Sequence, residues 1–175
     1  AAKMFGEDRM QEFTMLYPVE DTEHSAFELT SDYTISEQTF YILERQSKLN
    51  VPVYGYEFTY TSPYSPVASH IVDMPFVFGT LTNQYIFGGK SAQPSQTDRD
   101  FSEIIMSYWT NFAKTGSPNA EGLPTWPDYR EGLIMDLGNK VEARQNNKLD
   151  RFNFIGSFRN DGVFPLRWRN PDTRT

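Results

Sequence analysis

The spacing of apolar residues is most regular between residues 99 and 115, where we predict an amphipathic helix. Its apolar positions fall at i, i+3, i+4, i+7 and i+11, which is one broad face of a helix: Phe101, Ile104, Ile105, Tyr108 and Phe112. Thr97 and Asp100 have the spacing of a capping box and predict where the helix begins. Gly116 predicts where it ends, because glycine readily adopts the left-handed conformation that closes a helix.

Three further segments have helical patterns with fewer apolar positions. They are residues 5–17, 34–49 and 146–158. Thr34 and Glu37 have capping-box spacing and predict the start of the second of these helices. Pro18 predicts the end of the first, because the residue before a proline disfavours helical geometry. Residues 21–30 are acidic and mixed, and their pattern fits either a helix or a loop.

Strand-forming residues are concentrated at residues 51–60, with a shorter run at 133–137. Alternate aromatic residues of the first run share one face: Tyr54, Tyr56, Phe58 and Tyr60. Residues 61–70 form a loop rich in proline and serine directly after it. Residues 73–81 form a compact apolar run. A helix, a tight turn and a strand make half of a βαβ unit, so the pattern predicts an α/β fold.

Length, composition and charge narrow the possible classes of function. The chain has 175 residues, 38% of them hydrophobic and 15% aromatic, which suits one packed domain or a large piece of one. The formal net charge of −7 argues against nucleic acid as a partner. Without cysteine there is no disulfide, thiolate metal site or cysteine nucleophile. No apolar run approaches the roughly 18 residues of a membrane span.

The two histidines are the first candidates for chemistry. His24 lies among acidic residues, and a charged surface explains it well. His70 lies in the loop after the strongest strand, the edge where α/β folds gather ligands and catalytic groups. Asp73 follows three residues later, and its carboxylate either orients the imidazole or caps the next turn.

Other chemical motifs are weak or absent. No histidine pair has metal-ligand spacing, so we expect neither a metal nor a cofactor. Residues 88–91, GGKS, lack the spacing of a phosphate-binding loop and are interpreted as a surface turn. A G-x-S-x-G nucleophile elbow is also absent from the sequence. The chain therefore contains a candidate base without a candidate serine nucleophile.

Five sequence blocks in order resemble the type-B carboxylesterases, the cholinesterase-like branch of the α/β-hydrolases. They are VPVYGYEFTY at 51–60, SPVASHIVDMPFVFGTL at 65–81, FSEIIMSYWTNFAKTGSPN at 101–119, LPTWPDY at 123–129 and LIMDLGN at 133–139. The resemblance covers most of residues 30–140. It implies the C-terminal part of an α/β-hydrolase fold, with few strands, flanking helices and a sheet completed by a preceding portion. We expect residues 1–175 to form one domain, the last third of such a catalytic domain.

The resemblance also implies roles for particular residues. The family has its catalytic histidine in an H-x-x-[DE]-x-x-F-x-F-G segment, which corresponds here to His70 through Gly79. Asp73 matches the acidic position and is expected to support the histidine. Tyr64 and Phe76 are candidates for lining the substrate pocket; packing is an equal alternative for Tyr64 and the favoured one for Phe76 and Phe78.

The implied activity is hydrolysis of a small carboxylic ester by a serine, a Glu or Asp, and a histidine. The serine and the acid precede the histidine in this family, so we expect them in an upstream portion or a companion chain. A homodimer through helix 99–115 or the C-terminal helix is a further expectation. The absence of cysteine and of N-x-[ST] sequons favours a microbial esterase, and the compartment stays open, with a secreted or periplasmic one preferred.

Two alternatives from other classes of protein remain open at this point. One is a non-catalytic, cholinesterase-like binding or adhesion protein, which the complete histidine segment disfavours. The other is a small α/β binding module in which His70 has a structural role. A His70 side chain enclosed by hydrophobic packing would contradict the hydrolase interpretation.

Overall fold

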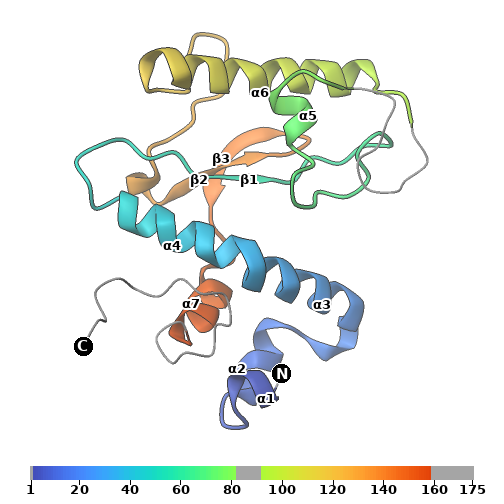
Figure 1. Ribbon diagram of the computed structural model, residues 1–175, viewed down its shortest axis with the longest axis vertical. Coiled ribbons are helices and arrows are strands. Elements are labelled where there is room, and N and C mark those ends of the chain that lie inside the picture. The colour runs from blue at the N-terminus through green and yellow to red at the C-terminus, as the bar shows by residue number, and fades with distance from the viewer. Residues whose placement is uncertain (1, 82–91, 159–175) are drawn as a thin grey trace, which may run out of the picture. The chain divides into compact units, whose positions relative to one another are not determined.

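The computed structural model describes residues 2–81 and 92–158, which form two compact units (Figure 1). The first unit comprises Ala1–Lys48 and Asn147–Thr175, and the second comprises Leu49–Asn146. Each unit has an aromatic core of its own. The expectation of one domain over residues 1–175 stays a prediction.

The second unit is built on a three-stranded sheet of β1 (Tyr56–Phe58), β2 (Leu133–Leu137) and β3 (Val141–Gln145), in that order. Strands β1 and β2 are parallel, with Tyr56 opposite Met135, and β2 and β3 are antiparallel. Between β1 and β2 the chain forms α5 (Met74–Val77), α6 (Gln96–Thr115) and η3 (Tyr129–Glu131) (Figure 1). A parallel strand pair joined through a helix confirms the predicted α/β class.

The core of the second unit lies between this sheet and α6. Tyr108 and Ile105 of α6 are fully buried with Met135 and Leu137 of β2. Trp126 closes the core from the segment after α6, and its indole Nε1 donates a hydrogen bond of 3.1 Å to the Gly55 carbonyl oxygen. Burial of these side chains accounts for most of the apolar face that the sequence places on α6, although Phe112 at its far end is 50% exposed.

The start of α6 differs from the prediction. The N-cap is Ser95, whose hydroxyl accepts a hydrogen bond from the Asp98 backbone N–H at 3.1 Å. The Asp98 carboxylate accepts from the Ser95 backbone N–H at 2.7 Å and completes the capping box. The predicted pair of Thr97 and Asp100 is therefore wrong by two residues. The predicted end is confirmed, since Gly116 has a φ of 76° and closes the helix.

The first unit is helical. Its elements are α1 (Ala2–Phe5), α2 (Met10–Leu16), η1 (Val19–Asp21), α3 (Thr22–Ser31), the π-helical turn η2 (Asp32–Ser36), α4 (Glu37–Gln46) and α7 (Leu149–Ser157). Aromatic rings from α1, α2 and α7 form its core, including Phe5, Phe13 and Phe154. Phe5 stacks on Phe13 with a centroid separation of 5.4 Å.

Several predicted elements of the first unit have different bounds. The predicted helix 5–17 is interrupted at Gly6, whose φ is 86°. The open segment 21–30 is helical as α3 and continues through η2 into α4. The predicted cap at Thr34 is therefore wrong: the Thr34 hydroxyl donates to the Thr30 carbonyl oxygen at 2.6 Å within a continuing helix.

The second unit also corrects the predicted strands. Only Tyr56–Phe58 of the predicted strand 51–60 pairs regularly with β2. Residues that flank Tyr56–Phe58 still form single backbone hydrogen bonds with β2. For example, the Met135 backbone N–H donates to the Gly55 carbonyl oxygen at 2.9 Å. The apolar run 73–81 forms the short helix α5, and β3 was not predicted.

The GGKS segment at 88–91 and the tail after residue 158 lie outside the described residues. In the part of the chain that is described, no helix combines the length and the apolar character needed to cross a bilayer.

Candidate active site

His70 lies in a turn between β1 and α5 and is exposed to solvent. The next residue, Ile71, has a φ of 67°, a left-handed conformation that is strained for a β-branched residue. Strain of this kind persists where the surrounding structure enforces it, and it is concentrated at functional sites. Val72 is buried and fixes the other end of the turn. The imidazole is therefore on a constrained turn and is free of hydrophobic packing.

Asp73 connects the end of this turn to β1 through its side chain. The Tyr56 hydroxyl donates a hydrogen bond of 2.9 Å to Oδ2 of Asp73 and so connects the turn to β1. Burial and the neighbouring Asp73 carboxylate raise the pKa of Tyr56 well above its ordinary value. Asp73 occupies the N-cap position of α5, but its side chain makes no capping hydrogen bond there. The capping alternative is wrong in that respect, and the orienting role stays a prediction.

A buried carboxylate, Asp98, holds the start of the loop that leads to His70. Its Oδ1 accepts hydrogen bonds from the Tyr60 hydroxyl at 2.8 Å and the Ser62 hydroxyl at 2.6 Å, while Oδ2 binds Ser95. Burial opposes ionisation of Asp98, but these hydrogen bonds outweigh it and lower its pKa. Burial and Asp98 raise the pKa of Tyr60 to about 12. The loop is thus bonded to the N-terminus of α6.

Tyr64 and Phe76 lie in the core of the second unit. Tyr64 is 5% exposed, Phe76 is fully buried, and their ring centroids are 6.0 Å apart. The Ser102 hydroxyl donates to the Phe76 carbonyl oxygen at 2.8 Å and joins α5 to α6. Packing explains both rings, and substrate contact stays a prediction. Phe78 is 67% exposed within the described residues, so packing of its ring stays a prediction.

His24 has a different setting. It lies in the first turn of α3, and its backbone N–H donates to the Asp21 carboxylate at 3.2 Å. Helix capping by Asp21 explains the acidic residue at this position. Among the described residues, no cluster of histidine and acidic side chains has the arrangement of a metal site.

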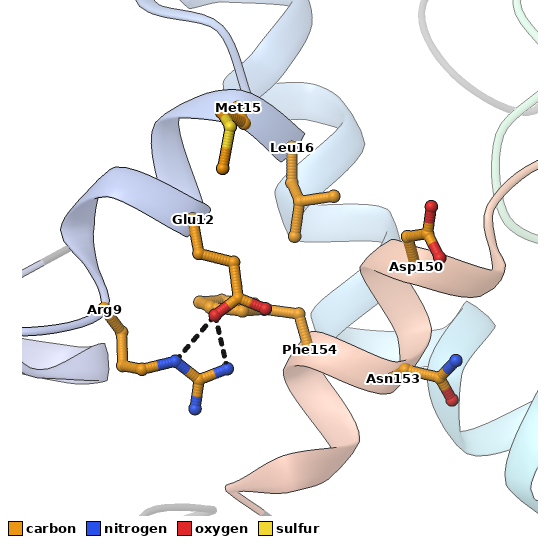
Figure 2. Close-up of a pocket in the computed structure, with 7 residues that line it drawn as sticks. All are labelled: Arg9, Glu12, Met15, Leu16, Asp150, Asn153 and Phe154. Atoms are coloured by element: carbon orange, nitrogen blue, oxygen red, sulfur yellow. Dashed lines mark hydrogen bonds and ion pairs between the residues drawn. The ribbon is translucent and has the colours of Figure 1, made fainter.

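A groove of about 350 Å³ lies in the first unit, between α2 and α7 (Figure 2). Sequence reasoning did not find it, because no motif marks residues that the fold brings together from the two ends of the chain. Its lining residues are Arg9, Glu12, Met15, Leu16, Asp150, Asn153 and Phe154. Arg9 Nε donates to Glu12 at 2.7 Å, and the guanidinium lies 5.0 Å from the centre of the Phe154 ring. The cation of the groove is therefore already paired, and the groove has no nucleophile–base pair.

Comparison with known proteins gives consistent matches. The model of the carboxylesterase family matches residues 15–155. Cocaine esterase of Homo sapiens is 39% identical over 111 residues, which covers 59% of this chain and 19% of that protein. Carboxylesterase 1E of Mus musculus is 30% identical over 130 residues, covering 69% and 22% respectively. The chain thus spans about a fifth of the length of these relatives.

The solved structures that resemble the chain include two of PNB esterase. One has a TM-score of 0.66 at 23% identity, and the match covers 88% of this chain and 31% of that one. The other has a TM-score of 0.68 at 24% identity, with the same coverage. At this level of identity the similarity shows the fold, which is that of the α/β-hydrolase esterases. The small sheet with its flanking helices corresponds to a part of that fold.

Proposed function

Because the chain belongs to the carboxylesterase family, we propose that it is part of a serine esterase in which His70 is the catalytic base. The observation that carries the proposal is the exposed His70 on a strained turn that follows β1, inside the H-x-x-[DE]-x-x-F-x-F-G segment. A base must reach a reacting hydroxyl, and an imidazole enclosed in the core would be unable to do so.

The proposed reaction passes through an acyl-enzyme. His70 accepts the proton of a serine hydroxyl as the serine oxygen attacks the ester carbonyl carbon. The resulting imidazolium gives that proton to the departing alkoxide when the ester C–O bond breaks. A water molecule then attacks the acyl group while His70 accepts its proton, and the serine oxygen recovers a proton as the carboxylic acid leaves. The substrate is a small carboxylic ester, and no cofactor takes part.

The serine and the triad acid are proposed to lie outside these residues, in a preceding portion of the protein or a companion chain. The absence of a nucleophile elbow and the short span relative to the relatives support this division. Exposed apolar side chains on either side of His70 support it as well: Val67, Met74 and Phe78. Met74 and Phe78 are four residues apart and share one face of the chain around α5. A further part of the same protein would bury that face.

The test is the turnover number of the complete protein on p-nitrophenyl acetate after His70→Ala. We expect kcat to fall on the order of 10⁴-fold with the fold retained. His24→Ala is the matched control, since it removes the other histidine from an exposed helix, and we expect it to retain wild-type activity. An active His70→Ala protein would remove the catalytic assignment. A wild-type protein without hydrolytic activity would favour the non-catalytic, cholinesterase-like class instead.

A further inference from the structure

We propose that Tyr56 is a positioning residue for His70, acting through its hydrogen bond to the Asp73 carboxylate. The inference rests on the proposed role of His70 and assigns a function to a β1 side chain that has no part in the proton transfers. According to this inference, the Tyr56 hydroxyl holds the strained turn in place on the side of β1.

Tyr56 is itself held firmly. It lies at the start of β1, where it is in register with Met135 of β2. Its ring packs edge-on against Trp109 and Trp126, with centroid separations of 5.3 and 5.9 Å. Tyr56 is 37% exposed, and its strand pairing and the two indole contacts restrict the positions that its hydroxyl can take.

Asp73 connects this donor to the turn that carries His70. Its backbone carbonyl oxygen accepts from the backbone N–H groups of Phe76 and Val77, at 3.0 and 2.9 Å, and so begins α5. The Met74 backbone N–H donates to the Ile71 carbonyl oxygen at 3.1 Å, so α5 is continuous with the strained turn. A shift of Asp73 would therefore pass directly to Ile71 and His70.

The direction of the effect follows from the strain at Ile71. A left-handed conformation at a β-branched residue persists only while its surroundings enforce it. Without the Tyr56 hydroxyl, the turn has one fewer constraint on the side of β1, and the imidazole samples a wider range of positions. Displacement of a catalytic group by about 1 Å can lower a rate by about 10²-fold. We therefore expect a loss in kcat with little change in KM.

The first variant is Tyr56→Phe in the complete protein, measured as kcat and KM on p-nitrophenyl acetate. We expect kcat to fall about 10-fold with KM within about 2-fold of the wild type. Tyr108→Phe is the matched control, because Tyr108 is a buried tyrosine of the same unit whose hydroxyl donates to the Pro124 carbonyl oxygen at 2.6 Å, with no bond to the histidine loop. Equal kcat values for the two variants would overturn the inference.

Three variants at Asp73 separate positioning from general loss of stability. Asp73→Ala removes the acceptor and should lower kcat about as much as Tyr56→Phe does. The double variant Tyr56→Phe/Asp73→Ala should have the same kcat as Asp73→Ala alone, because both changes break the same hydrogen bond. Asp73→Asn keeps an oxygen acceptor and should recover most of the lost kcat. Additive losses in the double variant, or an Asn variant as slow as the Ala variant, would contradict the proposal.

His70→Ala is measured in the same series, so that failure of this inference differs from failure of the proposed function. An inactive His70→Ala together with a fully active Tyr56→Phe would overturn only the positioning role. A fully active His70→Ala would overturn the proposed base and this inference with it.

Discussion

Each unit contains a buried carboxylate that accepts a hydrogen bond from a tyrosine. The pKa values of the two carboxylates are shifted in opposite directions. Asp98 of the second unit is 1% exposed and Asp32 of the first is fully buried. The Tyr60 hydroxyl donates to Asp98 at 2.8 Å, and the Tyr17 hydroxyl donates to Asp32 at 3.0 Å. Yet the pKa of Asp98 lies below its ordinary value and that of Asp32 lies above it.

The difference lies in how many donors reach each carboxylate. Both oxygens of Asp98 accept hydrogen bonds, from the Tyr60 and Ser62 hydroxyls and from Ser95. Asp32 has the opposite charge of Arg151 at 2.8 Å, but its Oδ1 has no hydrogen-bond partner among the described residues. For Asp32 the cost of burial therefore outweighs the attraction of the guanidinium. Both oxygens of Asp98 are hydrogen-bonded, whereas the Tyr17 hydroxyl and Arg151 both contact Oδ2 of Asp32.

Arg151→Ala should have the largest effect on stability. Arg151 pairs with both Asp32 and Glu28, and its removal leaves a fully buried carboxylate without its cation. We expect a loss of about 3–5 kcal/mol, measured by hydrogen exchange of the α7 and η2 amides in the complete protein. Arg130→Ala breaks an exposed arginine–aspartate pair and is the matched control, with a much smaller effect. Comparable losses would show that burial of the pair is unimportant.

Asp98→Ala should be next in size, at about 2–4 kcal/mol, because it removes the helix cap and the acceptor for Tyr60 and Ser62. Hydrogen exchange at the N-terminus of α6 is the measurement. Asp100→Ala is the control, because Asp100 is exposed and, within residues 2–81 and 92–158, its side chain accepts from the Gln96 side chain alone, at 2.7 Å. If Asp100→Ala were the more damaging change, the capping box of the structure would be wrong.

The pH dependence of stability should have opposite signs for the two carboxylates. The pKa of folded Asp98 is lowered, so its stabilising contribution is present above the ordinary value of 3.8 and is lost as the pH falls through the folded pKa. The pKa of folded Asp32 is raised, so its ionisation costs stability at neutral pH, and that cost decreases as the pH falls through the folded pKa towards 3.8.

Asp98→Asn and Asp32→Asn test these signs. The free energy of unfolding of each variant relative to wild type, followed between about pH 2 and 7, should change in opposite directions with pH. Changes of the same sign would mean that the donor count does not decide the direction of the pKa shift.

The smallest effects are expected from removing one hydroxyl at each site. Tyr17→Phe should cost about 2 kcal/mol, because it removes the neutral donor to Asp32 and leaves the ion pair with Arg151. Tyr60→Phe should cost about 1 kcal/mol, because Ser62 and Ser95 still donate to Asp98. The measurement is hydrogen exchange in η2 for Tyr17→Phe and in α6 for Tyr60→Phe. A larger loss for Tyr60→Phe would argue against the idea that Asp98 is the better bonded of the two carboxylates.

Sequence patterns predicted the elements that local rules determine. The apolar spacing of α6 and the glycines around β2 are local signals, and both elements were predicted within a few residues. The start of α6 was missed because Ser95 and Asp98 have the same spacing as Thr97 and Asp100. Asp98 is also bonded by Tyr60 and Ser62, which come from a distant part of the chain and are invisible to a local pattern.

Strand β3 was missed for a related reason. Its sequence, VEARQ, is rich in charge, and its two apolar residues, Val141 and Ala143, are too few to predict a strand. It pairs with β2, and Arg144 forms ion pairs with Asp136 on β2, at 2.8 Å, and with Glu57 on β1. Cross-strand pairing of this kind depends on neighbours that no local pattern shows.

Of the candidate site, the sequence supplied His70 and the acidic residue after it. It could not supply the left-handed conformation of Ile71, which a β-branched residue rarely adopts, nor the choice of Tyr56 as the partner of Asp73. Both depend on tertiary contacts. The sequence therefore identified which side chain is expected to react, and the structure shows the conformation and hydrogen bonds of the turn that carries it.

The most direct test of the account is labelling of the complete protein with a serine-reactive fluorophosphonate, followed by mass spectrometry. We expect the label on a single serine outside these 175 residues, with the labelling rate reduced on the order of 10³-fold or more in His70→Ala and unchanged in His24→Ala. A label on a serine within these residues, or an unchanged labelling rate in His70→Ala, would contradict the assignment of His70 as the base for a nucleophile supplied from elsewhere.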